Sequence, residues 1–180
     1  MELIIVGVIA LLLIFVLIGI YNRLVGLRQN VNQGTADIDA QLRQRHDLIP
    51  NLVSTVKGYA THEQDTLQQV IAARNAAATG SPNSGAEAGL RIALDKMLAL
   101  GEAYPDLKAN TTFLEFQAAL QTVEDEIQMS RRYYNGAVRN LNIQVESFPS
   151  NLIANAFKFI KAQYFELENE ADRQVPSVKF

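Results

Sequence analysis

Residues 3–20 read LIIVGVIALLLIFVLIGI, an apolar run from Leu3 to Ile20 that contains neither a charge nor a proline. A helix of this length rises about 27 Å, close to the hydrocarbon thickness of a bilayer. The alternative is a cleaved secretory signal, which begins with basic residues and ends at a small-residue cleavage site. No basic residue precedes this run, and Gly19-Ile20-Tyr21 fits such a site poorly. The run therefore predicts an uncleaved transmembrane anchor over residues 1–20.

The rest of the chain, residues 21–180, has the length of one domain and no second stretch apolar enough to cross a bilayer. We therefore expect a single-pass membrane protein. All 16 Lys and Arg residues and all but one of the 19 acidic residues lie in this domain, so it is nearly neutral and no nucleic-acid partner is expected. The absence of cysteine excludes disulfides, thiolate metal sites and cysteine nucleophiles.

Charges beside the apolar run bear on which side of the membrane holds the domain. Arg23 and Arg28 follow the run closely, whereas no Lys or Arg precedes it. Because positive residues are enriched on the cytoplasmic side of membrane spans, we expect the N-terminus outside and the domain in the cytoplasm. Asp37 and Asp39 lie near by, and the two arginines could belong to a folded helix, so the opposite side stays open.

Two long apolar stripes indicate that the domain is all-α. Both repeat in alternating steps of four and three, the coiled-coil-like seam of helices that pack lengthwise. They predict helices over residues 21–60 and 112–148 that are matched in length. The first stripe contains Val31, Thr35, Ile38, Leu42, Arg45, Ile49, Leu52 and Val56; the second contains Phe113, Phe116, Leu120, Val123, Ile127, Ser130, Tyr134, Ala137, Leu141, Val145 and Phe148.

Shorter helices complete the expected fold. Apolar periodicity predicts helices over residues 63–78 and 86–103, separated by a loop at residues 79–85 that is rich in Gly, Ser and Pro. Residues 175–180 alternate between apolar and polar, which fits an extended tail better than a sheet. The acidic residues between 166 and 172 have the spacing of a solvated helix end. The predicted fold is a single transmembrane helix followed by an elongated, antiparallel, up-and-down bundle of four to five helices.

Two prolines interrupt the helical patterns. Pro50 and Pro149 should each mark a kink, or a break and restart, because proline removes a backbone hydrogen bond and clashes with the preceding turn. After Pro149 a last helix is expected, whose apolar face could cover the open end of the bundle or meet a partner or lipid. That face contains Ile153, Phe157, Ile160, Tyr164 and Phe165.

Several blocks of this sequence resemble the bacterial LemA family, in family order along the chain. They are Tyr21-Asn22, RHDLIPNLV at residues 45–53, VKGYA at 56–60, His62-Glu63, YPDLKAN at 104–110, RRYYN at 131–135, SFPSN at 147–151 and the Pro-x-Val-x-Phe ending. The resemblance implies a membrane-anchored, antiparallel helical bundle in the bacterial inner (plasma) membrane, and no particular activity. Some relatives carry a lipidated cysteine just before Tyr-Asn, which would place their domain in the periplasm. Here Gly19-Ile20 stands at that position.

The residue spacing does not fit the usual enzyme motifs of helical proteins. A di-iron bundle needs Glu-x-x-His motifs, but Arg43 precedes His46 and Tyr59 precedes His62 at that offset. The zincin motif would need a second histidine where Thr66 stands. A glycine-rich phosphate loop is missing as well. We therefore expect no catalysis, no cofactor and no metal, and a hydrolase or metal protein is the least favoured class.

Polar residues within the stripes are the candidate functional residues. Arg45 falls where the pattern requires an apolar side chain, so it needs a buried carboxylate, for which Asp47, Glu124 and Glu126 are candidates. One interpretation is an ion pair that fixes helix register. The other is an interaction surface formed by the blocks around the two prolines. The candidate residues are Arg45, His46, Asp47, Pro50, Arg131, Arg132, Tyr133 and Pro149.

The sequence thus favours a non-enzymatic membrane scaffold or adaptor. Its partners would be the lipid bilayer through residues 3–20, further copies of itself in a homo-oligomer, and an unidentified membrane protein. Self-assembly is expected because anchoring concentrates and orients the copies, and the last helix offers more apolar side chains than one packing seam can use. The rival hypothesis is a lipid-sensing or membrane-remodelling protein that uses its aromatic C-terminal helix.

Overall fold

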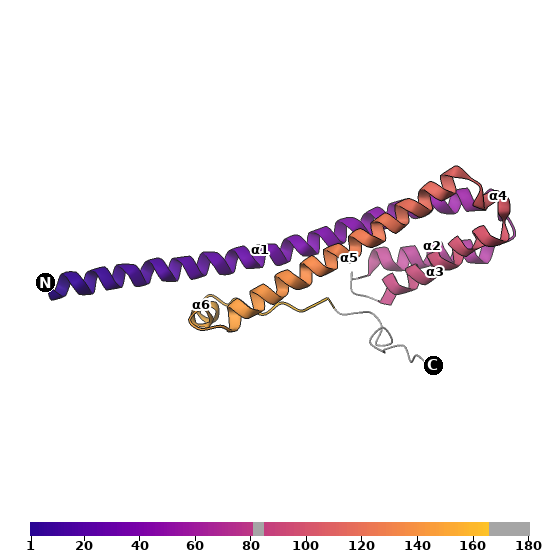
Figure 1. The fold of residues 1–180 in the computed structure, drawn as a ribbon. Helices are drawn as coiled ribbons and strands as arrows, with labels where there is room; N and C mark the ends of the chain where they lie inside the picture. The colour runs from indigo at the N-terminus through magenta and orange to yellow at the C-terminus, as the bar shows by residue number, and fades with distance from the viewer. Residues whose placement is uncertain (81–84, 166–180) are drawn as a thin grey trace, which may run out of the picture. The chain divides into compact units, whose positions relative to one another are not determined.

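A computed structural model describes residues 1–80 and 85–165 (Figure 1). The described residues are all-α, as the sequence predicts, and contain no strand. The expected extended tail and the acidic stretch lie outside the described residues, as does most of the loop between the two short helices. The helices are α1 (Glu2–Lys57), α2 (Gln64–Thr79), α3 (Gly85–Ala103), α4 (Pro105–Lys108), α5 (Thr111–Glu146) and α6 (Ser150–Ala156).

Helix α1 joins the apolar run and the first stripe in one continuous helix (Figure 1). A separate helix beginning at Tyr21 is therefore a wrong prediction, since no helix breaker stands between the two segments. The break expected at Pro50 does not occur either, and α1 continues to Lys57. Pro50 is exposed, so its ring lies on the solvent side of the helix, where the lost backbone bond is least costly.

The chain divides into two compact units. Unit 1 consists of Met1–Ala36 and Ser130–Tyr164, and unit 2 consists mainly of Asp37–Met129. Helices α1 and α5 each contribute to both units. The two stripes are therefore shared between two cores, each of which is built from one part of each long helix.

The core of unit 2 contains side chains from α1, α2, α3 and α5, with Leu107 from α4. Helices α2 and α3 pack directly on each other. The expected stripe residues from Ile38 to Val56 are buried, including Arg45. The largest fully buried side chains of this core are Ile49, Leu52, Val56, Val70, Leu90, Met97 and Leu107.

The core of unit 1 lies between residues 20–31 of α1, the end of α5 and the segment that follows α5. Leu24, Val138 and Ala154 are fully buried there. Helices α1 and α5 approach closely at Gly34, where an added Cβ would lie 3.0 Å from the Cα of Tyr134. A glycine at this position thus lets the two backbones pack directly on each other.

The chain turns after α5 differently from the sequence prediction. Helix α5 ends at Glu146, and a short α6 follows Pro149, so the predicted break at this proline is confirmed. Phe148, placed on the second stripe by its spacing, is instead exposed. The last helix is also shorter than predicted, because α6 ends at Ala156 and the residues from Phe157 onward leave the helix.

Helix α6 ends in a Schellman motif. The Phe159 N–H donates to the Ala154 carbonyl at 2.9 Å, and the Lys158 N–H donates to the Asn155 carbonyl at 3.3 Å. Lys158 has a left-handed backbone with φ 57°, which is the geometry this motif requires and which glycine usually supplies. The turn directs Phe159 back into the core of unit 1, where it is buried.

Candidate functional site

Arg45 forms a buried ion cluster that connects three helices of unit 2. Only 4% of its side chain is exposed, although it lies on the apolar stripe of α1. Its Nη1 donates to Oε2 of Glu124 on α5 at 2.8 Å, and its Nη2 donates to Oε2 of Glu87 on α3. One guanidinium group therefore pairs with two carboxylates from different helices.

Glu87 is shared between Arg45 and the neighbouring histidine. Nε2 of His46 lies 3.2 Å from Oε1 of Glu87, so the two carboxylate oxygens have different partners. The main-chain oxygen of His46 accepts a hydrogen bond from Nε of Arg74 on α2 at 3.2 Å. Helices α1, α2, α3 and α5 thus meet at this one cluster.

The electrostatics of the cluster keep Glu87 ionised. Burial by itself would raise the pKa of this carboxyl group, because a charge is poorly solvated inside a protein. The hydrogen bond with His46 and the positive charge of Arg45 outweigh that effect, and the pKa of Glu87 lies below its ordinary value of 4.5. The cluster therefore contains an ionised carboxylate held by two side chains of α1, at the point where four helices meet. That it fixes helix register stays a prediction.

The surface around the cluster is hollowed on two sides. A depression of about 280 Å³ lies beside His46 and Glu87, and one of about 160 Å³ lies beside Arg45 and Glu124. Among residues 1–80 and 85–165, no three His, Cys, Asp or Glu side chains are grouped closely enough to hold a metal ion. Arg45, His46, Glu87 and Glu124 pair with one another, and Nε of Arg45 is buried without a hydrogen-bond partner among the described residues.

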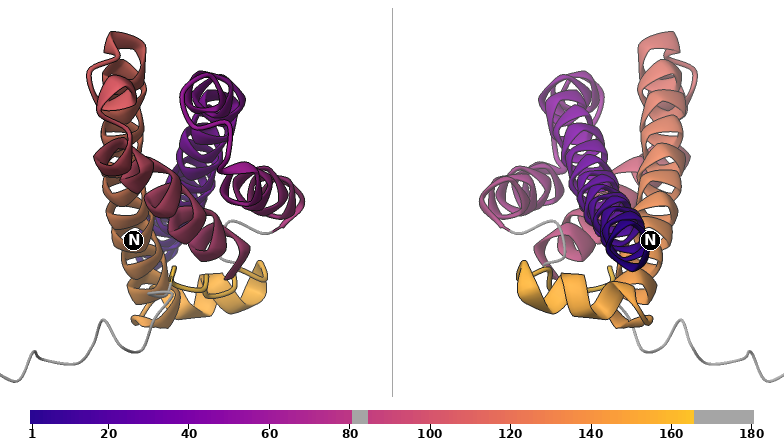
Figure 2. Two further views of the ribbon diagram at one scale, coloured as in Figure 1. Left: turned by 90° about the vertical axis from the view of Figure 1, so that its right-hand side faces the viewer. Right: turned by 90° about the vertical axis from the view of Figure 1, so that its left-hand side faces the viewer.

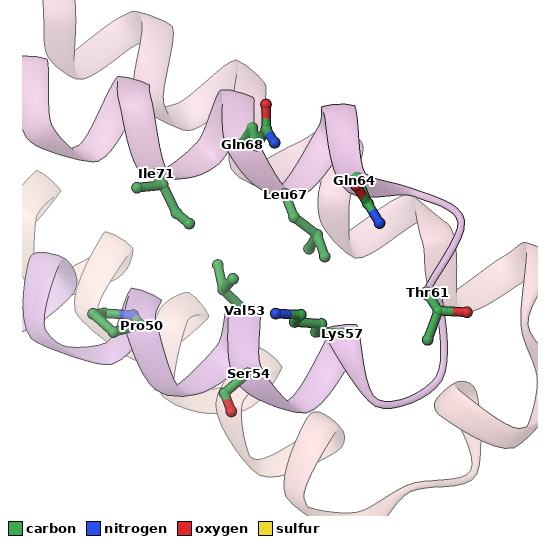
Figure 3. A pocket seen from close by; sticks show the side chains of 9 residues that line it. All are labelled: Pro50, Val53, Ser54, Lys57, Thr61, Gln64, Leu67, Gln68 and Ile71. Carbon is green, nitrogen blue, oxygen red and sulfur yellow. The ribbon is translucent and has the colours of Figure 1, made fainter.

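A larger groove lies beside Pro50 in unit 2 (Figure 3). It has a volume of about 580 Å³ and lies between α1 and α2. Figure 3 shows Val53 and Lys57 of α1 facing Leu67 and Ile71 of α2 across it. The other lining residues are Pro50, Ser54, Thr61, Gln64 and Gln68.

The eight candidate residues divide between the two units. Unit 2 contains Arg45 and His46, both in the buried cluster, and the exposed Asp47 and Pro50. Unit 1 contains Arg131, Arg132, Tyr133 and Pro149. Within unit 1, α5 separates Arg131 from Glu146 by about 22 Å along its axis, so Arg131 and Pro149 lie at different levels of this unit. That the two proline blocks form a common surface stays a prediction.

The sequence identifies only part of the buried cluster. Glu124 is one of the three carboxylates expected for Arg45, whereas Asp47 is exposed. Glu87 is missed, although its spacing to Leu90 and Leu94 places it on the buried stripe of α3. The partner of a buried arginine can therefore lie on the apolar stripe of a short helix such as α3, and not only on the long helices.

A second group of contacts surrounds the end of the apolar run in unit 1. The ring of Tyr21 lies 4.8 Å from that of Phe157 and 5.8 Å from that of Phe159, measured between centroids. The guanidinium carbon of Arg28 lies 5.1 Å from the centroid of Phe159, a cation–π contact. Tyr21 and Arg28 of α1 are thus tied to the segment that follows α6.

Comparison with known proteins supports the resemblance of the sequence blocks. The chain is 25% identical to "Protein LemA" of Metamycoplasma hominis, with 84% of this chain and 71% of that protein aligned. It is 23% identical to "Magnetosome protein MamQ 2" of Paramagnetospirillum magneticum, with 86% and 68% aligned. "Magnetosome protein MamQ" of Magnetospirillum gryphiswaldense is 20% identical over the same shares. The LemA family profile matches residues 34–180, and the chain belongs to the LemA family.

Proposed function

We propose that this protein is a single-pass protein of the bacterial inner membrane whose helical domain is a scaffold or adaptor without chemistry of its own. One observation carries the proposal. The large apolar side chains of residues 3–18 are between 46% and 88% exposed, yet the same helix continues into a core where Leu24 is fully buried. A continuous apolar surface of this size is not stable in water, and a bilayer would cover it.

The continuity of α1 supports a positioning role. Helix α1 is long and apolar enough to span a membrane, and its apolar run belongs to the same compact unit as the end of α5 and α6. Because no loop separates the span from Leu24, the bilayer would hold unit 1 at a fixed distance from the membrane surface. A scaffold gains from such an anchor, since it presents its surface at a defined height.

The buried cluster supports a structural role for Arg45, His46, Glu87 and Glu124. These side chains pair with one another inside unit 2, at the meeting point of four helices. A catalytic group would instead need access to a substrate. The groove beside Pro50, with its apolar walls, is a better candidate for contact with a protein partner.

We further propose that the protein forms homo-oligomers and binds another, unidentified membrane protein. Anchoring concentrates the copies in two dimensions and orients them alike, so weak contacts suffice for assembly. The apolar run contains Gly7, Ala10 and Gly19 but no Gly-x-x-x-Gly pair, so specificity would come from the helices of the domain.

The proposed orientation places the domain in the cytoplasm. It is based on Arg23 and Arg28, which follow the span while no basic residue precedes it. A C-terminal reporter pair tests it, with a fluorescent protein that matures only in the cytoplasm and a phosphatase that is active only in the periplasm. Phosphatase activity without fluorescence would reverse the orientation.

The alternative function is lipid sensing or membrane remodelling by the aromatic C-terminal segment. The exposed side chains of Phe157, Ile160 and Tyr164 favour it. Flotation of the fragment 21–180 with liposomes separates the two functions. Without its anchor, a scaffold domain should bind vesicles of every composition equally weakly, whereas a lipid sensor should float more strongly with particular lipids.

A further inference from the structure

Helix α6 lies crosswise to the start of α1 within unit 1. It is viewed end-on in Figure 1, where α1 runs across the page, and side-on in Figure 2, where α1 is viewed nearly along its axis. If α1 crosses a bilayer, a helix in this orientation lies parallel to the membrane plane. This is the orientation of interfacial amphipathic helices.

The depth of α6 follows from its contacts with the span. A depression of about 290 Å³ is lined by Leu17, Ile18 and Tyr21 of α1 and by Ile153 and Phe157. Since the apolar run ends at Ile20, Leu17 is less than one helical turn, about 5 Å, inside that end. Phe157 and Ile153 therefore pack at the level where the span would leave the hydrocarbon.

Polar contacts hold the following segment in place. Both ends of the Asn142 amide bind the main chain of Ala162, at 3.0 Å and 2.9 Å. The Tyr134 hydroxyl donates to the Gln163 carbonyl at 2.9 Å, and the Ser150 hydroxyl lies 2.6 Å from the Gln144 carbonyl oxygen. The segment is thus fixed along α5, and its exposed apolar side chains have defined positions.

Large apolar side chains point away from the core of unit 1 along this turn. Ile160 and Phe148 are each 80% exposed, Phe157 60% and Leu152 59%. Four large exposed apolar side chains within thirteen residues are more than the singly exposed ones that soluble surfaces commonly carry. One of them, Phe157, lies beside the apolar surface of the span, because it lines one depression together with Leu17 and Ile18.

We propose that residues 148–160, the interfacial turn, insert their apolar side chains into the headgroup–acyl boundary of the leaflet where α1 leaves the bilayer. This inference rests on the membrane anchor of the proposed function and adds a second, separate contact with lipid. The occupant is the bilayer itself, because any membrane that covers residues 3–20 also reaches the adjoining turn. A tyrosine such as Tyr21 favours this depth, because its ring is apolar and its hydroxyl is polar.

The proposal has a mechanical consequence for unit 1. A span alone lets a domain rotate and tilt about one axis, whereas a span with a crosswise interfacial turn fixes tilt and rotation together. The contacts of Phe159 with Tyr21 and Arg28 connect the two membrane elements. Unit 1 would then stand on the membrane in one orientation.

Single tryptophans test the insertion, because the natural chain contains no tryptophan. Full-length protein is reconstituted in phosphatidylcholine nanodiscs that contain lipids brominated at different depths. Ile160→Trp and Leu152→Trp report on the interfacial turn, and both positions are exposed, so neither change affects the core. Leu12→Trp reports on the span, and Ile92→Trp, at a site 55% exposed on α3, is the matched control in unit 2.

We expect lipid brominated near the glycerol to quench Ile160→Trp and Leu152→Trp at least about twofold more than Ile92→Trp, with blue-shifted emission. Leu12→Trp should be quenched best by lipid brominated at the chain ends. If both turn variants resemble Ile92→Trp while Leu12→Trp is quenched, the interfacial turn is refuted and the anchor stands. If Leu12→Trp is not quenched, the anchor itself fails.

A second copy of the chain is the competing occupant of the turn. In that case emission from Ile160→Trp would be blue-shifted but insensitive to brominated lipid, and the proposal would be overturned. Helicity measured by circular dichroism checks that each variant keeps its fold. If Ile160→Trp and Leu152→Trp show the same quenching, the result does not depend on a local effect of one substitution.

Discussion

Nε2 of His46 lies 3.2 Å from Oε1 of Glu87, deep in unit 2, while the other carboxylate oxygen of Glu87 pairs with Arg45. Only 3% of Glu87 is exposed. A single carboxylate therefore pairs with two side chains of the helix that also contains the apolar run. The stability of unit 2 should depend on it.

Replacing this carboxylate should be costly. Glu87→Gln leaves Arg45 with one partner and removes the charge that faces His46, so we expect the free energy of unfolding to fall by about 3 kcal/mol. The matched control is Glu102→Gln, which breaks the exposed pair with Lys108 and should cost less than about 1 kcal/mol. Chemical denaturation of both variants in the same mild detergent measures the difference. Equal losses would show that the cluster contributes no more than a surface pair.

The lowered pKa of Glu87 makes the stability of the fold depend on pH. The pKa of Glu87 is 4.5 in the unfolded chain and lower in the folded protein. At pH values between these two pKa values, the unfolded state therefore binds more protons than the folded state. The stabilisation is therefore complete above pH 4.5 and is lost as the pH falls through the lower, folded pKa. Melting temperatures measured down to pH 3 should fall more steeply for the natural protein than for Glu87→Gln. Parallel curves would assign the acid sensitivity to other groups.

The close approach of α1 and α5 predicts opposite effects at two glycines of one helix. At Gly26 an added Cβ meets nothing within 4 Å, so Gly26→Ala should stabilise the fold by up to about 1 kcal/mol through helix propensity. At Gly34 the added Cβ would meet the Tyr134 backbone, and Gly34→Ala should lower stability by about 1–3 kcal/mol through overpacking. Thermal melts of the two variants compare them directly. Similar gains at both positions would mean that the helices are not in close contact at Gly34.

The turn after α6 offers a stabilising substitution. Lys158 has a left-handed backbone that costs about 1 kcal/mol or more for a residue with a Cβ. Lys158→Gly removes that cost and should raise the melting temperature, even though glycine loses more entropy on folding. Lys158→Ala keeps the Cβ and serves as the control. A gain for alanine equal to that for glycine would point to the lost charge instead of the backbone.

The sequence predicts the helices well because their stripes are long and regular. The apolar residues from Ile38 to Val56 are buried as their spacing requires, and the break at Pro149 is confirmed. Of the two outcomes expected at Pro50, a kink or a break, the break does not occur, because α1 continues to Lys57. A kink at Pro50 stays a prediction. The early end of α6 depends on a left-handed lysine, for which the sequence carries no glycine signal.

The candidate site is predictable only in part, because the partners of a buried charge depend on how the helices pack. The position of Arg45 on a stripe shows that it is buried and needs a carboxylate. Which carboxylate reaches it depends on how α3 packs against α1, and that depends on the whole core. Glu87 is therefore found from the structure, while Glu124 could be named from the sequence.

Crosslinking of the full-length protein in native membranes, followed by mild-detergent extraction and mass measurement, tests the scaffold function most directly. We expect species well above the 20.0 kDa of one chain, containing several copies or a second membrane protein in fixed proportion. Carbonate washing of the same membranes should leave the protein in the pellet. A protein that stays in the membrane as a single chain, without crosslinks and without any stoichiometric partner, would contradict the scaffold function.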